Sequence, residues 1–205
     1  MPSTVVHLAI GGIVAAALLG EEFDGRAVAV VLAATAVPDL DTFVGLYVQG
    51  AHRALLHTLV VPAMATVALT YDTRLSRVSR LHTRWGARGT RVAWVAVAAL
   101  VFGGILPDLM TNGVNAFYPF YDRFLTVDGE LLLSNQRGVV QTFVDLSGAP
   151  DRTTENTHYW TGVDPTPGQE PTNVERIFPV VRSGFQLLVV GLGAFTLGAR
   201  FLEER

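Results

Sequence analysis

Apolar stretches alternate with short polar segments along the whole chain, and the longer ones approach the length of a membrane helix. A spanning α-helix needs about 20 mostly apolar residues. The stretches near this length are 5–20, 26–48, 54–71, 92–106 and 180–199. Pro38 interrupts the second one and disfavours helix at the preceding residue, so we expect a helix over 27–37 followed by a turn. The pattern predicts an all-α, polytopic membrane protein with about five transmembrane helices.

The ionisable residues within the first four stretches lie at one end of each stretch. They occur near the start of the first, at the end of the second, at the start of the third and at the end of the fourth. If consecutive helices run in opposite directions, all these ends meet at one membrane face. Ionisable groups at such depth are costly and mark functional sites. The sequence therefore predicts one metal site with six candidate ligands, His7, Asp39, Asp41, His52, His57 and Asp108.

These ligands offer imidazole and carboxylate donors without sulfur, because the chain has no cysteine. Such donors suit zinc, manganese or iron, and we expect zinc first, as one or two divalent ions. A cation compensates carboxylates that would otherwise repel one another. An open coordination position lowers the pKa of bound water towards about 7, which is the chemistry of hydrolysis. His52 and His57 are five residues apart and would not share a helical face, so His52 precedes the helix or the two bind different metals.

Two catalytic roles follow from the same segments. Arg53, between two candidate ligands, is predicted to stabilise an anionic transition state. The alternative is an interfacial arginine that pairs with Asp39 or Asp41. Asp41 is predicted to act as a general base if it does not bind the metal. Four more polar residues are either site contacts or ordinary capping and packing residues, namely Thr58, Thr111, Asn112 and Asn115. His158 either closes over the site from the outer loop or is an ordinary surface residue.

Composition agrees with a membrane protein. The 205 residues are 50% hydrophobic and 16% charged, against about 25% charged in an average soluble domain. The net charge of −3 gives no reason to expect a nucleic-acid partner, and the bilayer is the expected one. Without cysteine, disulfides and thiolate chemistry are excluded. The first twenty residues lack a basic region and are expected to remain as a helix.

The arginines predict the orientation in the membrane. Between the third and fourth apolar stretches only Asp72 opposes six of them, Arg74, Arg77, Arg80, Arg84, Arg88 and Arg91. Short arginine-rich loops stay in the cytoplasm. This topology places the His/Asp ends on the outer side of the cell membrane, with the C-terminal tail inside. Beyond topology, this arginine-rich segment is either a solvated surface segment with no further role or a dedicated site for anionic lipids.

Residues 114–179 form the one long polar region of the sequence. The segment 124–133 has the pattern of a β-hairpin, with strands 124–127 and 130–133 around an Asp-Gly turn. From 149 to 174 the composition is that of a loop, which could cover the site as a lid. We therefore expect one domain in three parts: metal-site helices over 1–113, an extramembrane region over 114–179, and a last transmembrane helix with its tail over 180–205.

Taken in order, these motifs resemble the membrane-bound metal-dependent hydrolase family, the inner-membrane group that includes the YdjM and YbcI proteins. The matching elements are His7, Pro-Asp-x-Asp at 38–41, His-Arg-x-x-x-His-Thr-Leu at 52–59, Asp-x-x-Thr at 108–111, and Pro-Phe at 119–120. The resemblance covers about residues 1–120 and implies a metal-dependent hydrolase. The chain departs from the pattern at Gly104, where many members carry a His; its absence removes one ligand and bears on a second metal.

The expected function is hydrolysis of a phosphoester or ester of a lipid-like substrate. Two alternatives come from other classes of protein: an ion or proton transporter, and a non-catalytic scaffold with a structural metal site. Transport predicts polar residues along the depth of several helices. The helix centres 13–19 and 95–102 contain none, which favours a site at one face.

Overall fold

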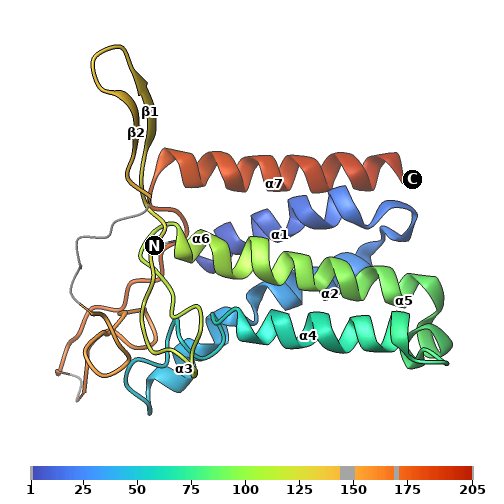
Figure 1. The fold of residues 1–205 in the computed structure, drawn as a ribbon, viewed down its shortest axis with the longest axis horizontal. Helices are drawn as coiled ribbons and strands as arrows, with labels where there is room; N and C mark the ends of the chain where they lie inside the picture. The colour runs from blue at the N-terminus through green and yellow to red at the C-terminus, as the bar shows by residue number, and fades with distance from the viewer. Residues whose placement is uncertain (1, 144–150, 169–170, 205) are drawn as a thin grey trace.

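The computed structural model describes residues 2–143, 151–168 and 171–204 of the chain. The helices lie side by side with roughly parallel axes, and helices that follow one another along the chain run in opposite directions (Figure 1). They are α1 Thr4–Leu18, α2 Gly25–Ala36, α4 Val60–Thr70, α5 Arg80–Ala99 and α7 Gly184–Glu203. The fold is mainly helical, as the apolar pattern predicted.

Capping side chains determine where these helices begin. Ser3, Asp24, Ser79 and Ser183 precede α1, α2, α5 and α7, and each side chain accepts a hydrogen bond from a backbone N–H of the first turn. Such caps satisfy N–H groups that lack a partner within the helix. Short turns close the far ends of α1 and α4, namely the 3₁₀ turn η1 Gly20–Glu22 and the π-helical turn η3 Tyr71–Leu75.

The chain bends by 47° after α2. Pro38 begins a 3₁₀ turn, η2 Pro38–Leu40, and the short helix α3 Asp41–Gly45 follows. Proline has no N–H to donate and its ring clashes with the preceding helical turn, so α2 cannot continue straight. The bend gives Asp39 and Asp41 different directions from those of a continuous helix.

The fourth apolar stretch forms one long helix with an irregular end. α5 passes through a π-helical segment, η4 Leu100–Ile105, into the short helix α6 Leu106–Leu109. Together Arg80–Leu109 make 30 residues. A π-helical turn is wider than an α-helical one and often occurs at functional sites. Here it precedes Asp108.

An apolar core lies among α1, α2 and α5, with Ala15, Leu19, Val31, Val95 and Ala99 at its centre. Next to this core, glycines let the backbones of α1 and η4 approach each other closely. A Cβ built on Gly103 would lie 3.0 Å from the backbone nitrogen of Gly11. Such contacts between glycines are typical of packing in membrane helices. They hold the irregular η4 segment against α1.

The prediction of five spanning helices is not supported. By length and hydropathy two helices could cross a membrane, Arg80–Leu109 and Gly184–Glu203, or three if the bent pair Gly25–Ala36 and Pro38–Gly45 forms one span. The prediction counted apolar residues that the structure places in turns. α4 has 11 residues because 46–59 form a loop, and α1 has 15. At 1.5 Å per residue these two helices measure about 16 and 22 Å, short of the 30 Å hydrocarbon layer.

A β-hairpin is present in the polar region, but of the two predicted strands only the second, 130–133, coincides with an observed strand, and that strand pairs with the segment that follows it. The antiparallel strands are β1 Leu131–Ser134 and β2 Gly138–Gln141, with Leu131 opposite Gln141. The segment predicted as the first strand packs on the helix bundle instead. Leu125 pairs with Val114 through two backbone hydrogen bonds of 3.0 and 2.9 Å, and Phe124 is buried. Tertiary contacts therefore outweighed the local Asp-Gly turn signal.

Candidate metal centre

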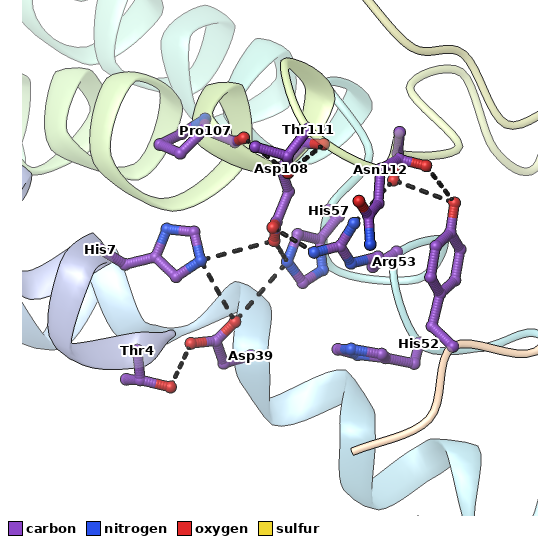
Figure 2. A network of polar contacts seen from close by, with 12 residues as sticks. Thr4, His7, Asp39, His52, Arg53, His57, Pro107, Asp108, Thr111 and Asn112 are labelled. Atoms are coloured by element: carbon purple, nitrogen blue, oxygen red, sulfur yellow. Dashed lines mark hydrogen bonds and ion pairs between the residues drawn. The ribbon is translucent and has the colours of Figure 1, made fainter. Parts of the chain in front are cut away.

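Four segments place imidazole and carboxylate groups around a common point at one end of the bundle (Figure 2). His7 comes from α1, Asp39 from η2, His57 from the loop before α4, and Asp108 from α6. His7 Nε2 lies 3.9 Å from Asp39 Oδ1 and 3.5 Å from Asp108 Oδ2. His57 Nε2 lies 3.7 Å and 3.0 Å from the same two oxygens. These four residues are called the four-residue centre below.

The spacing of these atoms fits a bound cation. Ligand atoms about 2.0–2.1 Å from a zinc-like ion lie about 2.9–3.4 Å from one another. The observed separations run from 3.0 to 3.9 Å, so small side-chain movements would complete such a cage. His7, Asp39 and Asp108 also offer atoms that all lie within 4.8 Å of one another. The donor set is the nitrogen and oxygen set that divalent transition metals prefer.

Both histidines are held by their other ring nitrogen. His7 Nδ1 lies 2.7 Å from the carbonyl oxygen of Gly103, and His57 Nδ1 lies 2.9 Å from Asp41 Oδ2. A hydrogen bond at Nδ1 leaves Nε2 free to bind a metal and fixes the orientation of the ring. His57 Nε2 is buried and has no hydrogen bond among the residues that the structure describes. Asp108 Oδ2 lies 3.0 Å from this nitrogen without the geometry of a hydrogen bond, and a metal ion bound by both atoms would satisfy the nitrogen.

Asp41 forms a second cluster beside the first. Its Oδ1 lies 2.7 Å from His52 Nδ1, and its Oδ2 accepts hydrogen bonds from His57 and from the backbone N–H of Arg53 at 3.0 Å. Asp41, His52 and His57 could themselves hold an ion. The direct hydrogen bonds favour a different role, because a carboxylate occupied by two imidazoles and a backbone N–H has little capacity left for a metal. The structure thus brings all six predicted ligands together, and the geometry separates them into a centre of four and a supporting pair, Asp41 and His52.

Arg53 contacts the four-residue centre through Asp108. Its guanidinium is fully buried, pairs with Asp108, donates to the Gly113 carbonyl oxygen at 3.2 Å, and lies 4.8 Å from the centre of the Tyr159 ring. The guanidinium therefore pairs with Asp108, and not with Asp39 or Asp41 as the alternative prediction had it. With φ at 66°, Arg53 adopts a backbone conformation that is rare for residues other than glycine. Its position favours orientation of a candidate ligand over contact with a substrate.

The charges within the site balance only if two of the histidines are protonated or a cation is bound. Three carboxylates, those of Asp39, Asp41 and Asp108, face one guanidinium. With neutral imidazoles, negative charge remains in a largely buried environment, and such charge is costly unless it is paired. A divalent cation would remove this imbalance.

Two residues that sequence reasoning did not select are part of the site. The Gly103 carbonyl oxygen orients His7, and only the π-helical segment places it there. Tyr159 packs against Arg53 and Phe124, and its hydroxyl donates to the Asn112 carbonyl oxygen at 2.7 Å. No sequence signal identified either one, because both roles depend on tertiary contacts.

The other predicted polar residues make structural contacts. Thr111 bonds to the carbonyl oxygens of its own helical turn, and Thr58 donates to the Ala116 and Tyr118 carbonyl oxygens. Asn115 donates to Asp122 at 2.5 Å. His158 lies 3.9 Å from Asp164 and does not belong to the four-residue centre. Thr58 and Asn115 are buried, and His158, with 16% of its side chain exposed, is not the surface residue that the alternative described.

Gly104 occupies a position with no room for a side chain. A Cβ there would lie 2.7 Å from the Thr35 carbonyl oxygen and 3.0 Å from Pro38 Cγ. The histidine that the resemblance leads one to expect at this position therefore has no space in this chain. The local packing leaves the other four side chains as the ligand set.

The opposite end of the bundle carries arginines in structural contacts. Arg88 pairs with the exposed Asp24, and this guanidinium holds the pKa of the carboxyl below its usual value. Arg91 donates to the Leu18 carbonyl oxygen at 2.9 Å. The basic segment and the four-residue centre thus lie at opposite ends of the helices (Figure 1).

Apolar helices that bury imidazoles and carboxylates at one end define a helical membrane protein with a candidate metal centre. The chain belongs to the YdjM inner membrane protein family, whose model matches residues 1–158. The matched region contains all six predicted ligands, and it confirms the resemblance to this inner-membrane group. The protein is therefore an inner-membrane protein. The comparison with curated proteins and the comparison with solved structures each gave no match.

Proposed function

We propose that this protein is a metal-dependent hydrolase of the inner membrane that binds one divalent cation in the four-residue centre. The observation that carries the proposal is the convergence of His7 Nε2, His57 Nε2, Asp39 Oδ1 and Asp108 Oδ2 within 3.0–3.9 Å. A structural ion could be fully enclosed, whereas hydrolysis needs access. A substrate can reach the centre at Asp39, because 23% of the Asp39 side chain is exposed, compared with 2% of the Asp108 side chain.

A divalent cation at this position would polarise the scissile ester and lower the pKa of a water molecule. The chain's own residues do the rest. Asp41 and the Gly103 carbonyl oxygen orient the two histidines, and Arg53 orients Asp108. His52 is a suitable general base, since Asp41 holds its Nδ1 and its Nε2 has no partner among the described residues. An imidazole held in this way can accept a proton at the free nitrogen.

We further propose that the protein crosses the membrane several times, with the four-residue centre near the outer face. The arginines support this orientation, because they lie at the other end of the bundle and short arginine-rich segments stay in the cytoplasm. An epitope after Glu203 and another near residue 2 would give the topology by protease protection in inverted vesicles. Protection of the N-terminal tag and cleavage of the C-terminal tag are expected.

Hydrolysis is tested with detergent-purified protein that has been reconstituted with zinc or manganese. We expect turnover of an activated phosphodiester or a lipid ester, and a loss of about 10²–10⁴-fold in kcat for His52→Gln. The matched control is His82→Gln, an exposed histidine at the other end of the bundle. If a panel of phosphoesters and esters shows no turnover while metal stays bound, the site is structural and the hydrolase proposal falls.

Transport is the rival function, and the packing argues against it. The residues below the four-residue centre form the apolar cluster with Ala15, Leu19, Val31 and Val95. An ion or proton pathway would need polar groups at this depth. Metal or proton flux in proteoliposomes that is abolished by His57→Ala would favour transport instead.

A further inference from the structure

A cleft leads to the most exposed ligand of the four-residue centre. It has a volume of about 260 Å³ and lies between the start of α1 and the segments 160–163 and 177–182. Asp39 and His52 line it from the inside. His7, His57 and Asp108 are at most 2% exposed. Access to the centre therefore runs past Asp39, through this cleft.

The wall of the cleft is built by contacts between distant segments. The Ser3 hydroxyl donates to the Val180 carbonyl oxygen, and Thr42 bonds to Thr161 at 2.8 Å through their side chains. Thr4 donates to Asp39 Oδ2 at 2.5 Å. These bonds join the start of α1, Asp39 and the helix α3 to the segments around Thr161 and Val180 at the opening of the cleft. The cleft is thus a defined part of the fold.

The lining combines apolar surface with one cation. Trp160, Ile177 and Phe178 contribute large apolar side chains that are 44–66% exposed. Arg182 lies beside them, with its guanidinium 5.1 Å from the centre of the Trp160 ring. Among the residues that the structure describes, this guanidinium has no carboxylate partner. Exposed apolar surface beside an unpaired arginine matches a ligand with an apolar chain and an anionic group.

We infer that this cleft binds an amphiphile with a phosphate headgroup, which reaches Arg182 and the Asp39 side of the centre while the chain lies against Trp160 and Phe178. The inference rests on the proposed function, because it names the substrate class of the same site. Arginine recognises phosphate through several N–H groups. The unpartnered His52 Nε2 adds a second polar group to the inner wall. An uncharged lipid would leave the arginine without a partner.

Trp160 provides the readout. Replacing Trp85 and Trp94 by Phe leaves it as the one tryptophan of the chain. The protein is held in dodecyl maltoside micelles, whose neutral twelve-carbon chain is then always in excess. Dodecyl phosphate is titrated, and inorganic phosphate is titrated separately. We expect saturable quenching by dodecyl phosphate and about tenfold weaker binding in Arg182→Gln, with affinity partly restored in Arg182→Lys, which keeps the charge but not the guanidinium.

The control is Arg77→Gln, an exposed arginine in the α4–α5 turn, which should bind as the parent does. Unchanged affinity in Arg182→Gln, or equal affinity for inorganic phosphate, would overturn the inference. Metal content and phosphodiester turnover are measured on the same samples. Binding without turnover supports the cleft assignment and removes the proposed function. Turnover without saturable binding does the reverse.

Discussion

Asp41 Oδ2 lies 2.9 Å from His57 Nδ1, on the side of the imidazole ring opposite to the four-residue centre. The same carboxylate holds His52 through its other oxygen. Asp41 therefore links the His52–His57 loop to the bend after α2. Its buried position and its four hydrogen bonds indicate a residue that fixes others in place. This relationship leads to the first prediction.

Asp41→Asn is expected to weaken metal binding about 10–100-fold, the usual effect of losing a carboxylate that orients a ligating histidine. An amide cannot accept from both imidazoles and both backbone N–H groups. The affinity is measured by competition with a chelator. Asp24→Asn, which removes a carboxylate at the other end of the bundle, should leave it unchanged. Equal affinity in wild type and Asp41→Asn would show that Asp41 does not orient His57.

Arg53→Met should destabilise the fold by about 3–5 kcal/mol, because removing one partner of a buried ion pair leaves the other charge uncompensated. Asp108 would lose the guanidinium, and the Gly113 carbonyl oxygen would lose a donor. Unfolding in mixed micelles gives the free energy. Arg88→Met is the control, since its pair with Asp24 is exposed and such pairs contribute little. A similar effect in both variants would contradict the buried position of Arg53.

Gly104→Ala should cost about 1–3 kcal/mol of stability, as overpacking of a tight contact does. The added methyl would press on Thr35 and Pro38, which precede Asp39, so metal affinity should fall as well. Gly191→Ala is the matched control, because nothing lies within 4 Å of a Cβ there. It should be neutral or slightly stabilising. A Gly104→Ala protein with normal stability and metal content would argue against the tight packing of η4.

Asp72 gives a pH dependence away from the centre. The Ser79 hydroxyl and the backbone N–H groups of Arg80 and Leu81 donate to its carboxylate and hold its pKa below the ordinary value of 3.8. A lowered folded-state pKa contributes stability above the unfolded-state value, and this contribution is lost as the pH falls through the folded-state value. Wild type should therefore melt at a higher temperature than Asp72→Asn at pH 6, and the difference should shrink below about pH 4. A difference that stays constant with pH would contradict this account of the turn.

The sequence predicted which residues meet, because that depends on simple topology. His7 begins α1, Asp39 follows α2, His57 precedes α4, and Asp108 lies near the end of the fourth stretch. Alternating directions bring such ends together whatever the details of packing. The sequence could not separate Asp39 from Asp41, since two similar carboxylates receive different roles only from the bend at Pro38.

Other features depended on contacts that a sequence does not display. The loop 46–59 is apolar enough to resemble part of a helix, yet Asp41 holds it through the backbone N–H groups of Arg53 and Leu56. Phe124 was predicted to lie in a strand, but it packs against Tyr159 outside any strand of the described residues. Hydrophobic patterns fix element type in long regular stretches, but they do not reveal which side chain a distant residue will contact.

The central claim is that the four-residue centre holds a divalent cation, and elemental analysis of the purified protein tests it most directly. We expect about one zinc, manganese or iron ion per chain after reconstitution and dialysis, in line with four ligands. His57→Ala should lose the ion, whereas His82→Ala should keep it. Wild-type protein that stays free of metal after reconstitution, or His57→Ala protein that binds as much metal as wild type, would contradict the account.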